Sequence, residues 1–344
     1  MKAVKIVMCG VGRVGSEFIR LLADRSHALQ EDYCLRPVLS AVVDIGGAAI
    51  TRSDNGLDAA QLLDHLGQGG SVQDFGSYGQ PGLTGEQAID QAQAQVLVEA
   101  TPTNLEHGQP GKGHVLSAIS RGMQVVSANK GPFVLFYQEL HDMARRNNCG
   151  LYISAAAAAA LPTLDVGRIC LAGAEVQSVQ GILNGTTNYI LTQMRDKGTD
   201  FEQALRQAQE MGIAETDPSY DLQGQDTANK MILICNRILG TAFGLGDISI
   251  QGITSISAGD IAKATEQGCV LKLVGSAVKR AGRIELAVAP KLLDEGHPLA
   301  SVNGSEKAIS YQTDTMGEIT LSGGRSSPVG AAAALLKDLI NAYR

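Results

Sequence analysis

The sequence contains no tryptophan, and aromatic residues make up only 4% of it. Charged residues are also sparse, at 18% compared with roughly 25% in typical soluble domains, whereas hydrophobic residues reach 44%. This balance excludes an intrinsically disordered chain, because such chains combine low hydrophobicity with high net charge. At 344 residues the chain exceeds what one hydrophobic core usually supports, so we expect two intertwined domains.

The chain also lacks a run of Lys and Arg residues and any long run of uncharged apolar residues. With a net charge of -7, nucleic acids and anionic membrane surfaces are excluded as partners, and no segment is expected to span a membrane. The N-terminal "MKAVKIVMCGVG" breaks at Gly10 and has no cleavage site, so we interpret it as a strand and not as a signal peptide. A small molecule is the expected partner.

The six cysteines form no CxxC pair, and most of them lie inside apolar runs. We therefore predict buried, reduced thiols in a reducing compartment, which implies a cytoplasmic location, and we assign no metal ligands. The cysteines are Cys9, Cys34, Cys149, Cys170, Cys235 and Cys269.

A glycine motif stands near the N-terminus. In "VKIVMCGVGRVGSEFIRLL" an apolar strand is followed by GxGxxG and then by helical periodicity. The first glycine allows a tight turn, the second lets the backbone approach a pyrophosphate, and the third lets helix and strand pack closely. A glycine-rich turn without a ligand is the alternative, but the order of strand, turn and helix favours dinucleotide binding. The candidate cofactor-binding residues here are Gly10, Val11, Gly12, Arg13, Val14 and Gly15.

The residues after the second expected strand, "PVLSAVVD", bear on the choice of cofactor. Asp44 ends this strand, where a carboxylate would accept hydrogen bonds from the adenosine ribose and favour NAD. Arg13 could instead bind a phosphate, and Arg52 could pair with a 2'-phosphate, so NAD and NADP both remain candidates. Residues 45–85 are rich in Gly, Ser and Gln, and we expect a loop-rich insertion around the short helix "DAAQLLDHL".

Two further buried strands, "AQVLVEATPTN" and "GMQVVSANKGP", end in polar residues. Ligands of a parallel sheet bind beyond the carboxyl ends of its strands, which places Thr101, Thr103, Asn129 and Lys130 on the cofactor side. Lys130 could also be an ordinary exposed loop lysine. A helix, "PFVLFYQELHDMARRNN", and a strand, "CGLYIS", are expected to follow.

Four carboxylates and one ammonium lie together in "AETDPSYDLQGQDTANK", just before the apolar "MILICNRIL". They are Glu215, Asp217, Asp221, Asp226 and Lys230. Asp226 and Lys230 have i, i+4 spacing and share a helix face, which usually means a surface ion pair worth about half a kcal/mol or less. The helix continues into "MILICNRIL", which is too apolar for a surface helix. We therefore expect its first turn to open into a cleft.

Together with the glycine motif, "VVSANKGP", "GILNGTTNYIL" and "AETDPSYDLQGQDTANK" resemble homoserine dehydrogenase over nearly the whole chain. The resemblance implies the interconversion of L-homoserine and L-aspartate 4-semialdehyde with a nicotinamide cofactor, for threonine and methionine synthesis. It also implies a homodimer. It assigns Lys230 as the catalytic lysine, Asp226 as the acid one turn before it, and Lys130 as a lysine near nicotinamide and substrate.

By the same resemblance, Glu215 and Asp221 bind the substrate, whose ammonium must be paired when it leaves water. A lysine can donate a proton to the aldehyde oxygen, or accept one in the reverse direction. The turn at Asn184, Gly185 and Thr186 could offer backbone N-H groups to the substrate carboxylate, although a simple helix cap is the alternative.

The segment "YISAAAAAALP" departs from the family, which usually has a Glu and a glycine-rich turn that help to hold a monovalent cation. Here Ser154 and Ala155 to Ala160 occupy the segment, so the cation site is in doubt, and we predict close packing at a helix start.

The predicted fold is α/β, with a Rossmann-type dinucleotide-binding domain at residues 1–133 plus 323–344. An α+β substrate-binding and dimerisation domain is predicted at 134–322, with strands in "CVLKLVGSAVKRAGRIELAVAPKLL" and "EKAISYQTDTMGEITL". A dehydrogenase of a related hydroxy- or amino-acid and a cofactor-binding regulator without turnover are the alternative functions.

Overall fold

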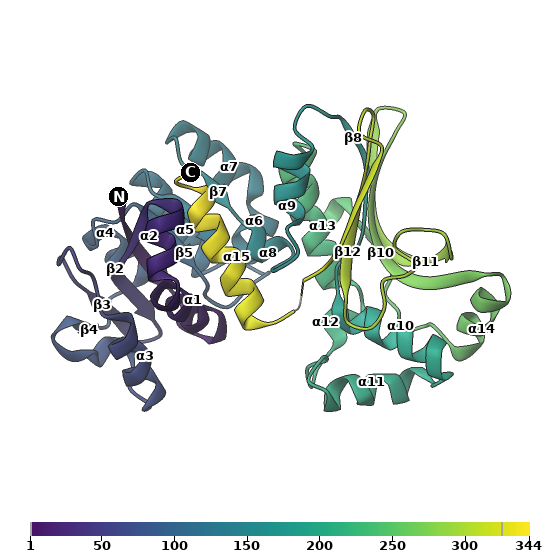
Figure 1. Cartoon of the computed structure of the whole chain (residues 1–344), viewed down its shortest axis with the longest axis horizontal. Helices are drawn as coiled ribbons and strands as arrows, with labels where there is room; N and C mark the ends of the chain where they lie inside the picture. The colour runs from purple at the N-terminus through teal and green to yellow at the C-terminus, as the bar shows by residue number, and fades with distance from the viewer. Residues whose placement is uncertain (1, 325) are drawn as a thin grey trace. The chain divides into compact units, whose positions relative to one another are not determined.

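The computed structural model describes residues 2–324 and 326–344, and its contacts divide the chain into two units. The first unit is Met1–Ala160 with Ser327–Arg344, and the second is Leu161–Ser326 (Figure 1). The predicted boundary between 133 and 134 therefore falls inside the first unit. The reason is that strand β7 (Leu151–Tyr152) pairs with β6 (Gln124–Ser127) and so extends the first sheet.

The first unit contains a seven-stranded sheet in the order β4-β3-β2-β1-β5-β6-β7. Strands β1 (Lys2–Cys9), β2 (Leu35–Asp44), β5 (Val96–Glu99), β6 and β7 are parallel to their neighbours within this set. The run Ile6, Val7 and Met8 of β1 is fully buried, as expected for a parallel strand that is covered on both faces. The predicted Rossmann-type fold is confirmed.

The prediction of a loop-rich insertion at residues 45–85 was partly wrong. Strands β3 (Gly47–Ile50) and β4 (Gly79–Pro81) lie there and extend the sheet in antiparallel fashion beyond β2. Gly46, with φ +96°, makes the turn between β2 and β3, and the alanines of β3 are buried. The short, glycine-containing "GAAI" has too few β-branched residues to predict a strand.

Helices cover this sheet, and the C-terminal helix packs against α1 (Figure 1).

The predicted single helix in 132–148 is broken at Phe136. The φ of this residue, -134°, is not helical, and its ring lies under the Lys112 ammonium at 3.5 Å. The helices of the first unit are α1 (Arg13–Asp24), α2 (Ser26–Tyr33), α3 (Ala59–Gly67), α4 (Gly85–Gln91), α5 (Gly111–Ser120), α6 (Gly131–Leu135), α7 (Tyr137–Arg146), α8 (Ser154–Ala157) and α15 (Pro328–Asn341), with 3-10 turns η1 (Val72–Asp74) and η2 (Gly76–Tyr78).

The second unit contains a six-stranded sheet in the order β13-β12-β8-β10-β11-β9. Its strands are β8 (Val176–Ile182), β9 (Ser249–Ile250), β10 (Cys269–Arg280), β11 (Arg283–Asp294), β12 (Lys307–Thr313) and β13 (Glu318–Gly323). All pairs are antiparallel except that of β11 with β9, so the strands predicted in 269–293 and 306–321 are confirmed.

The helices of the second unit are α9 (Thr163–Asp165), the π-turn η3 (Val166–Cys170), α10 (Gly185–Lys197), α11 (Phe201–Glu210), α12 (Ser219–Leu222), α13 (Gln225–Ile238), η4 (Leu245–Asp247) and α14 (Ala258–Glu266). Helix α13 packs against β8, β10 and β11 (Figure 1). A Cβ atom at Gly275 of β10 would lie 2.4 Å from Met231 Cγ, so this glycine allows the close approach of helix and sheet. As predicted from "MILICNRIL", α13 is a buried helix.

The cysteines are all free, but the prediction that most of them are buried was wrong. Only Cys9 and Cys235 are buried, whereas Cys34 and Cys170 are exposed. Both exposed residues lie at the end of a helical segment, where the chain turns away from the core.

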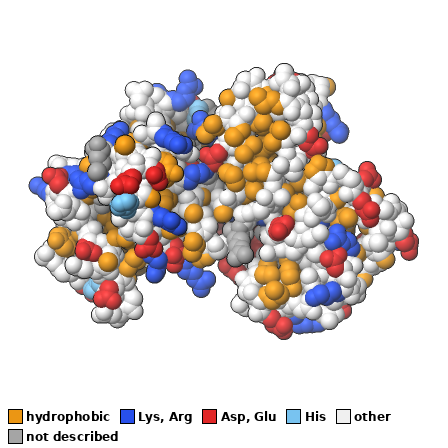
Figure 2. Space-filling model, in the orientation of Figure 1, with side chains coloured by type: hydrophobic (Ala, Val, Ile, Leu, Met, Phe, Trp, Pro, Cys, Tyr) orange, Lys and Arg blue, Asp and Glu red, His pale blue; other side chains and the backbone are white. Residues whose placement is uncertain are grey.

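Figure 2 shows Lys and Arg side chains interspersed with Asp and Glu over the visible face. Among the described residues, no helix is long and apolar enough to cross a membrane.

Candidate active site

The glycine turn after β1 is shaped by close packing on two sides. Gly10 has φ +91°, and a Cβ atom there would lie 2.7 Å from Ala100 C and Thr101 N. A Cβ atom at Gly15 would lie 2.0 Å from Gly10 O. A Cβ at Gly12 would meet no atom within 4 Å, so the backbone is open on that side at the N-terminus of α1. This open position fits the close approach of a dinucleotide pyrophosphate.

The other predicted cofactor residues lie around this turn and at the end of β2. Asp44 is the last residue of β2 and is half-buried, and Gly10 N donates to the neighbouring Val43 O at 2.8 Å. Arg13 and Arg52 are exposed. Val11 is buried and Val14 is half-buried, and both pack with the core of the first unit.

The residues after β5 and β6 are connected to one another, as their position at one sheet edge predicts. Lys130 N donates to Thr103 Oγ1 at 3.3 Å, and Asn129 Nδ2 donates to Thr101 Oγ1 at 3.1 Å. Lys130 begins helix α6 and is half-buried. The two segments therefore form one hydrogen-bonded edge at the carboxyl ends of the strands.

In the second unit, Asn184 links two carboxylates of the acidic stretch. Its Nδ2 donates to Asp221 Oδ1 at 2.7 Å and to Asp226 Oδ2 at 3.0 Å. Its Oδ1 accepts from Thr187 N at 2.9 Å and thereby caps helix α10. One buried amide therefore fixes the start of α10 relative to both acids.

Lys230 completes this cluster. Its ammonium forms an ion pair with Asp226, one turn earlier on α13, and donates to Leu183 O at 2.8 Å. The Lys230 side chain is 15% exposed and the Asp226 side chain 8% exposed, so the pair is nearly desolvated but still reachable. This is not the solvated surface pair that i, i+4 spacing usually indicates.

Asp221 sits in an environment that opposes its ionisation. Burial raises the pKa of this carboxyl, and the nearby charge of Asp226 raises it further. The hydrogen bond from Asn184 and the Lys230 charge act in the opposite direction. A cation placed beside Asp221 would therefore stabilise its ionised form.

The structure does not bring all predicted substrate residues into this cluster. Glu215 is exposed, and among the described residues its carboxylate has no hydrogen bond or ion pair. Gly185 is buried at the start of α10 and Thr186 Oγ1 donates to Ile213 O at 3.1 Å. Asp217 accepts from Ser219 N at 3.1 Å and so forms the local turn before α12.

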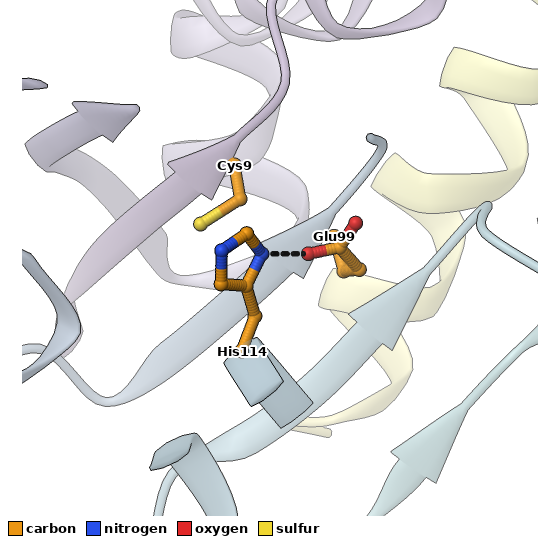
Figure 3. A group of neighbouring side chains, drawn as sticks. All are labelled: Cys9, Glu99 and His114. Carbon is orange, nitrogen blue, oxygen red and sulfur yellow. Dashed lines mark hydrogen bonds and ion pairs between the residues drawn. The ribbon is translucent and has the colours of Figure 1, made fainter. Parts of the chain in front are cut away.

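Two connecting groups were missed from the sequence, namely Asn184 as a link between the acids and Glu99. Glu99 is 0% exposed at the end of β5, and its Oε2 accepts from His114 Nδ1 at 2.7 Å (Figure 3). A charged residue inside the apolar run "VLVEA" was the available signal, because acids are almost never fully buried without partners.

The alanine segment forms the short helix α8 and then turns, with φ +54° at Ala159. Ser154 N and Oγ both donate to the buried Asp338 of α15, each at 2.8 Å. Ser154 is thus held by a carboxylate of its own unit. The predicted close packing at a helix start is confirmed for the buried residues Ala155, Ala156 and Ala157.

The chain combines a Rossmann-type unit that has an open glycine turn with a second unit that carries a nearly desolvated lysine and carboxylates, and this combination indicates an NAD(P)-dependent oxidoreductase acting on a CH-OH group. A family model described as homoserine dehydrogenase, NAD binding domain, matches residues 10–154, and a model described as homoserine dehydrogenase matches residues 162–340. The chain belongs to the homoserine dehydrogenase family.

Similar proteins agree with this family over the full chain. A homoserine dehydrogenase of Methanocaldococcus jannaschii is 36% identical over 98% of each chain. An NAD(+)-dependent homoserine dehydrogenase of Pseudomonas canavaninivorans is 33% identical over 100% of this chain and 97% of its own. The crystal structure of a putative homoserine dehydrogenase of Archaeoglobus fulgidus has a TM-score of 0.88 at 30% identity, covering 99% of both chains. A hyperthermophilic archaeal homoserine dehydrogenase mutant in complex with NADPH shares the fold, with a TM-score of 0.83 at 24% identity over 99% of this chain and 98% of its own.

Proposed function

We propose that Lys230 is the proton-transfer group in the NAD(P)-dependent interconversion of L-homoserine and L-aspartate 4-semialdehyde. The observation that carries this proposal is the ammonium of Lys230, held by Asp226 and by Leu183 O in a nearly desolvated cluster. In the reductive direction the ammonium donates its proton to the aldehyde oxygen. In the oxidative direction the neutral amine accepts the hydroxyl proton, and a bound nicotinamide supplies the hydride acceptor.

Asp226 has the role of holding Lys230 in place and balancing its charge. The carboxylate forms an ion pair with the ammonium, and the backbone acceptor Leu183 O restricts where Nζ can point. Because Asn184 donates to the same Asp226 oxygen, the carboxylate itself has a fixed orientation. The pair therefore presents a proton at a defined position instead of along a flexible side chain.

Asp221 is proposed to pair with the ammonium of the amino-acid substrate. Its carboxylate is half-buried beside Asp226, so an incoming cation relieves the repulsion between two acids. Glu215 is a second proposed partner, although its exposed position gives it a smaller share of the binding energy. The start of α10 at Gly185 and Thr186 is proposed to face the substrate carboxylate.

On the cofactor side, we propose that the glycine turn binds the pyrophosphate, that Asp44 contacts the adenosine ribose and that Lys130, Thr101 and Thr103 lie toward the nicotinamide. Asp44 and the similarity to an NAD(+)-dependent relative support NAD. The exposed Arg13 and Arg52 keep NADP as a candidate.

We also propose a cytoplasmic homodimer that serves threonine and methionine synthesis. The second unit exposes large hydrophobic side chains on and beside its strands, with Leu292 at 52%, Met316 at 47% and Ile319 at 38% exposure. Such residues are suited to a contact between two copies.

Initial-rate measurements with L-homoserine and either NAD or NADP test the function directly. We expect turnover with homoserine and a preference for one cofactor. A panel of related hydroxy- and amino-acids serves as the comparison, and a higher kcat/KM for any of these than for homoserine would contradict the proposed substrate.

A further inference from the structure

We propose that Glu99, held by His114, is a positioning residue for the cofactor site, because one buried carboxylate ties together the chain segments that follow β5 and β6. This inference rests on the proposed binding of the cofactor beyond the carboxyl ends of these strands. Neither residue is proposed to touch the substrate.

Glu99 accepts hydrogen bonds from three separate places in the first unit. His114 Nδ1 on α5 lies 2.7 Å from Oε2. Thr101 N lies 2.9 Å from Oε1, which also accepts from the Thr101 hydroxyl and from Asn129 Nδ2 at 3.3 Å. Glu99 is 0% exposed and His114 is 4% exposed, so water does not compete for these bonds.

The segments tied to Glu99 are those that carry the predicted cofactor residues. Asn129 Nδ2 also donates to Thr101 Oγ1, and Asn129 Oδ1 accepts from Gly131 N at 3.0 Å at the start of α6. Lys130, between these two positions, donates its N-H to Thr103. Glu99 therefore fixes the backbone on both sides of Lys130.

The segment that follows Glu99 also packs against the glycine turn. The backbone at Ala100 and Thr101 lies so near Gly10 that a Cβ atom there would be 2.7 Å away. A shift of the segment after Glu99 would consequently move the backbone atoms of Ala100 and Thr101 that pack against the glycine turn. Misplacement by about 1 Å far from the reacting atoms can reduce rates by about 100-fold.

The donors around Glu99 explain why this position requires a carboxylate. Four groups point hydrogen atoms at its two oxygens, and a carboxylate is the side chain that accepts without donating. A glutamine would place an NH2 group against one set of donors and leave at least one buried donor without an acceptor.

A metal site is the competing interpretation, because ligand atoms of Cys9, Glu99 and His114 lie within 4.8 Å of one another (Figure 3). Both oxygens of Glu99 are already engaged by protein donors. Gly85 leaves little room at His114 Nε2, since a Cβ atom there would lie 2.0 Å from it. Burial and the Glu99 charge also hold the pKa of Cys9 well above its usual value, whereas a metal needs the thiolate.

The test measures NADH binding to Glu99→Gln and His114→Asn by fluorescence titration of the full chain, together with KM for homoserine at saturating cofactor. We expect NADH to bind about 10-fold more weakly to Glu99→Gln and about 3-fold more weakly to His114→Asn, in which three donors to Glu99 remain. The KM for homoserine should stay within about 2-fold, because the substrate cluster lies in the other unit.

Asp338→Asn is the control, since Asp338 is also a buried carboxylate of the same unit but holds Ser154, which follows β7, and not the segments after β5 and β6. We expect a lower melting temperature with unchanged NADH affinity. If this control loses as much NADH affinity as Glu99→Gln, the effect is one of general stability and the proposal is overturned.

Two other results would overturn it. One is wild-type NADH affinity in folded His114→Asn, which decides the matter even if Glu99→Gln does not fold. The other is one zinc ion per chain in the purified protein that is lost in Cys9→Ser. Failure of the wild type to oxidise homoserine would instead contradict the proposed function, because NADH binding is measured without substrate.

Discussion

Two clusters contain buried carboxylates, one around Glu99 in the first unit and one around Lys230 in the second, and their carboxylates have different surroundings. Around Glu99 the carboxylate is fully buried and both oxygens accept from protein donors. Around Lys230 two acids share one asparagine, the ammonium is paired with Asp226, and the lysine side chain remains 15% exposed. The first cluster has no capacity left for a ligand, whereas the second has charge that is not fully balanced.

The difference matches the two roles that we propose, a supporting role for Glu99 and a reactive role for Lys230. A carboxylate saturated with backbone and side-chain donors stabilises the segments that supply them. Two acids beside a single ammonium leave one carboxyl with a raised pKa, and such a group gains from an added cation. The predictions below test this contrast, from the largest expected effect to the smallest.

Lys230→Ala should reduce kcat by at least about 100-fold, because it removes the proposed proton-transfer group while the cofactor unit is untouched. NADH affinity, measured by fluorescence titration, should remain unchanged. Lys263→Ala is the control, since it removes an exposed lysine of the same unit. Near-normal turnover in Lys230→Ala would mean that another group transfers the proton.

Asp221→Asn should raise the KM for homoserine by about 10-fold or more, since it removes the carboxylate that we propose to pair with the substrate ammonium. Glu215→Gln should raise the same KM by less, because Glu215 is exposed and its partner is better screened by water. Steady-state kinetics of the two variants give the ranking. A larger effect of Glu215→Gln would reverse the proposed order of the two acids.

Asp44→Ser should shift the ratio of kcat/KM values toward NADP by several-fold, whichever cofactor the wild type prefers. A carboxylate at the end of β2 repels a 2'-phosphate, which carries nearly two negative charges. Arg52→Ala should reduce kcat/KM for NADP more than for NAD if this arginine reaches the phosphate. Both variants are assayed with both cofactors, and an unchanged ratio in Asp44→Ser would show that its carboxylate does not face the ribose.

The smallest expected effect is on stability. Because the pKa of Asp221 is raised in the folded protein, its contribution to stability is present below the usual Asp pKa of about 4 and is lost as the pH rises through the folded value. Asp221→Asn should therefore raise the melting temperature by about 2 °C at pH 7 and by less near pH 4. Melting curves of both proteins from pH 4 to pH 8 provide the check, and a gain that does not depend on pH would exclude this origin.

Parts of the fold with strong periodic patterns were predictable from the sequence. The strand, glycine turn and helix at the N-terminus appear as β1, Gly10 and α1, and the alternating runs in 269–293 appear as β10 and β11. The strands β3 and β4 were not predictable, because they are only four and three residues long and gain their stability from pairing with β2. At the break between α6 and α7, the Phe136 ring packs under the ammonium of Lys112, a residue on α5.

The candidate site shows the same division. The i, i+4 spacing of Asp226 and Lys230 predicted their contact, since the geometry of a helix brings such pairs together. The link through Asn184 was not predictable, because it joins the start of α10 to residues on two other helices. Glu215 lies only six residues before Asp221 in the sequence, yet its carboxylate is outside the hydrogen-bonded cluster.

The sequence by itself determined the class of fold, the glycine turn and the lysine with its acid, because each depends on neighbours within a few residues along the chain. Only the tertiary structure decided which carboxylates are saturated and which are left partly unpaired. Glu99 meets donors from α5 and from the end of β6, and Asp221 meets Asn184 from α10. Burial and charge balance are sums over groups that are distant in sequence, so the reactivity of an acid follows from the folded chain and not from its position in a motif.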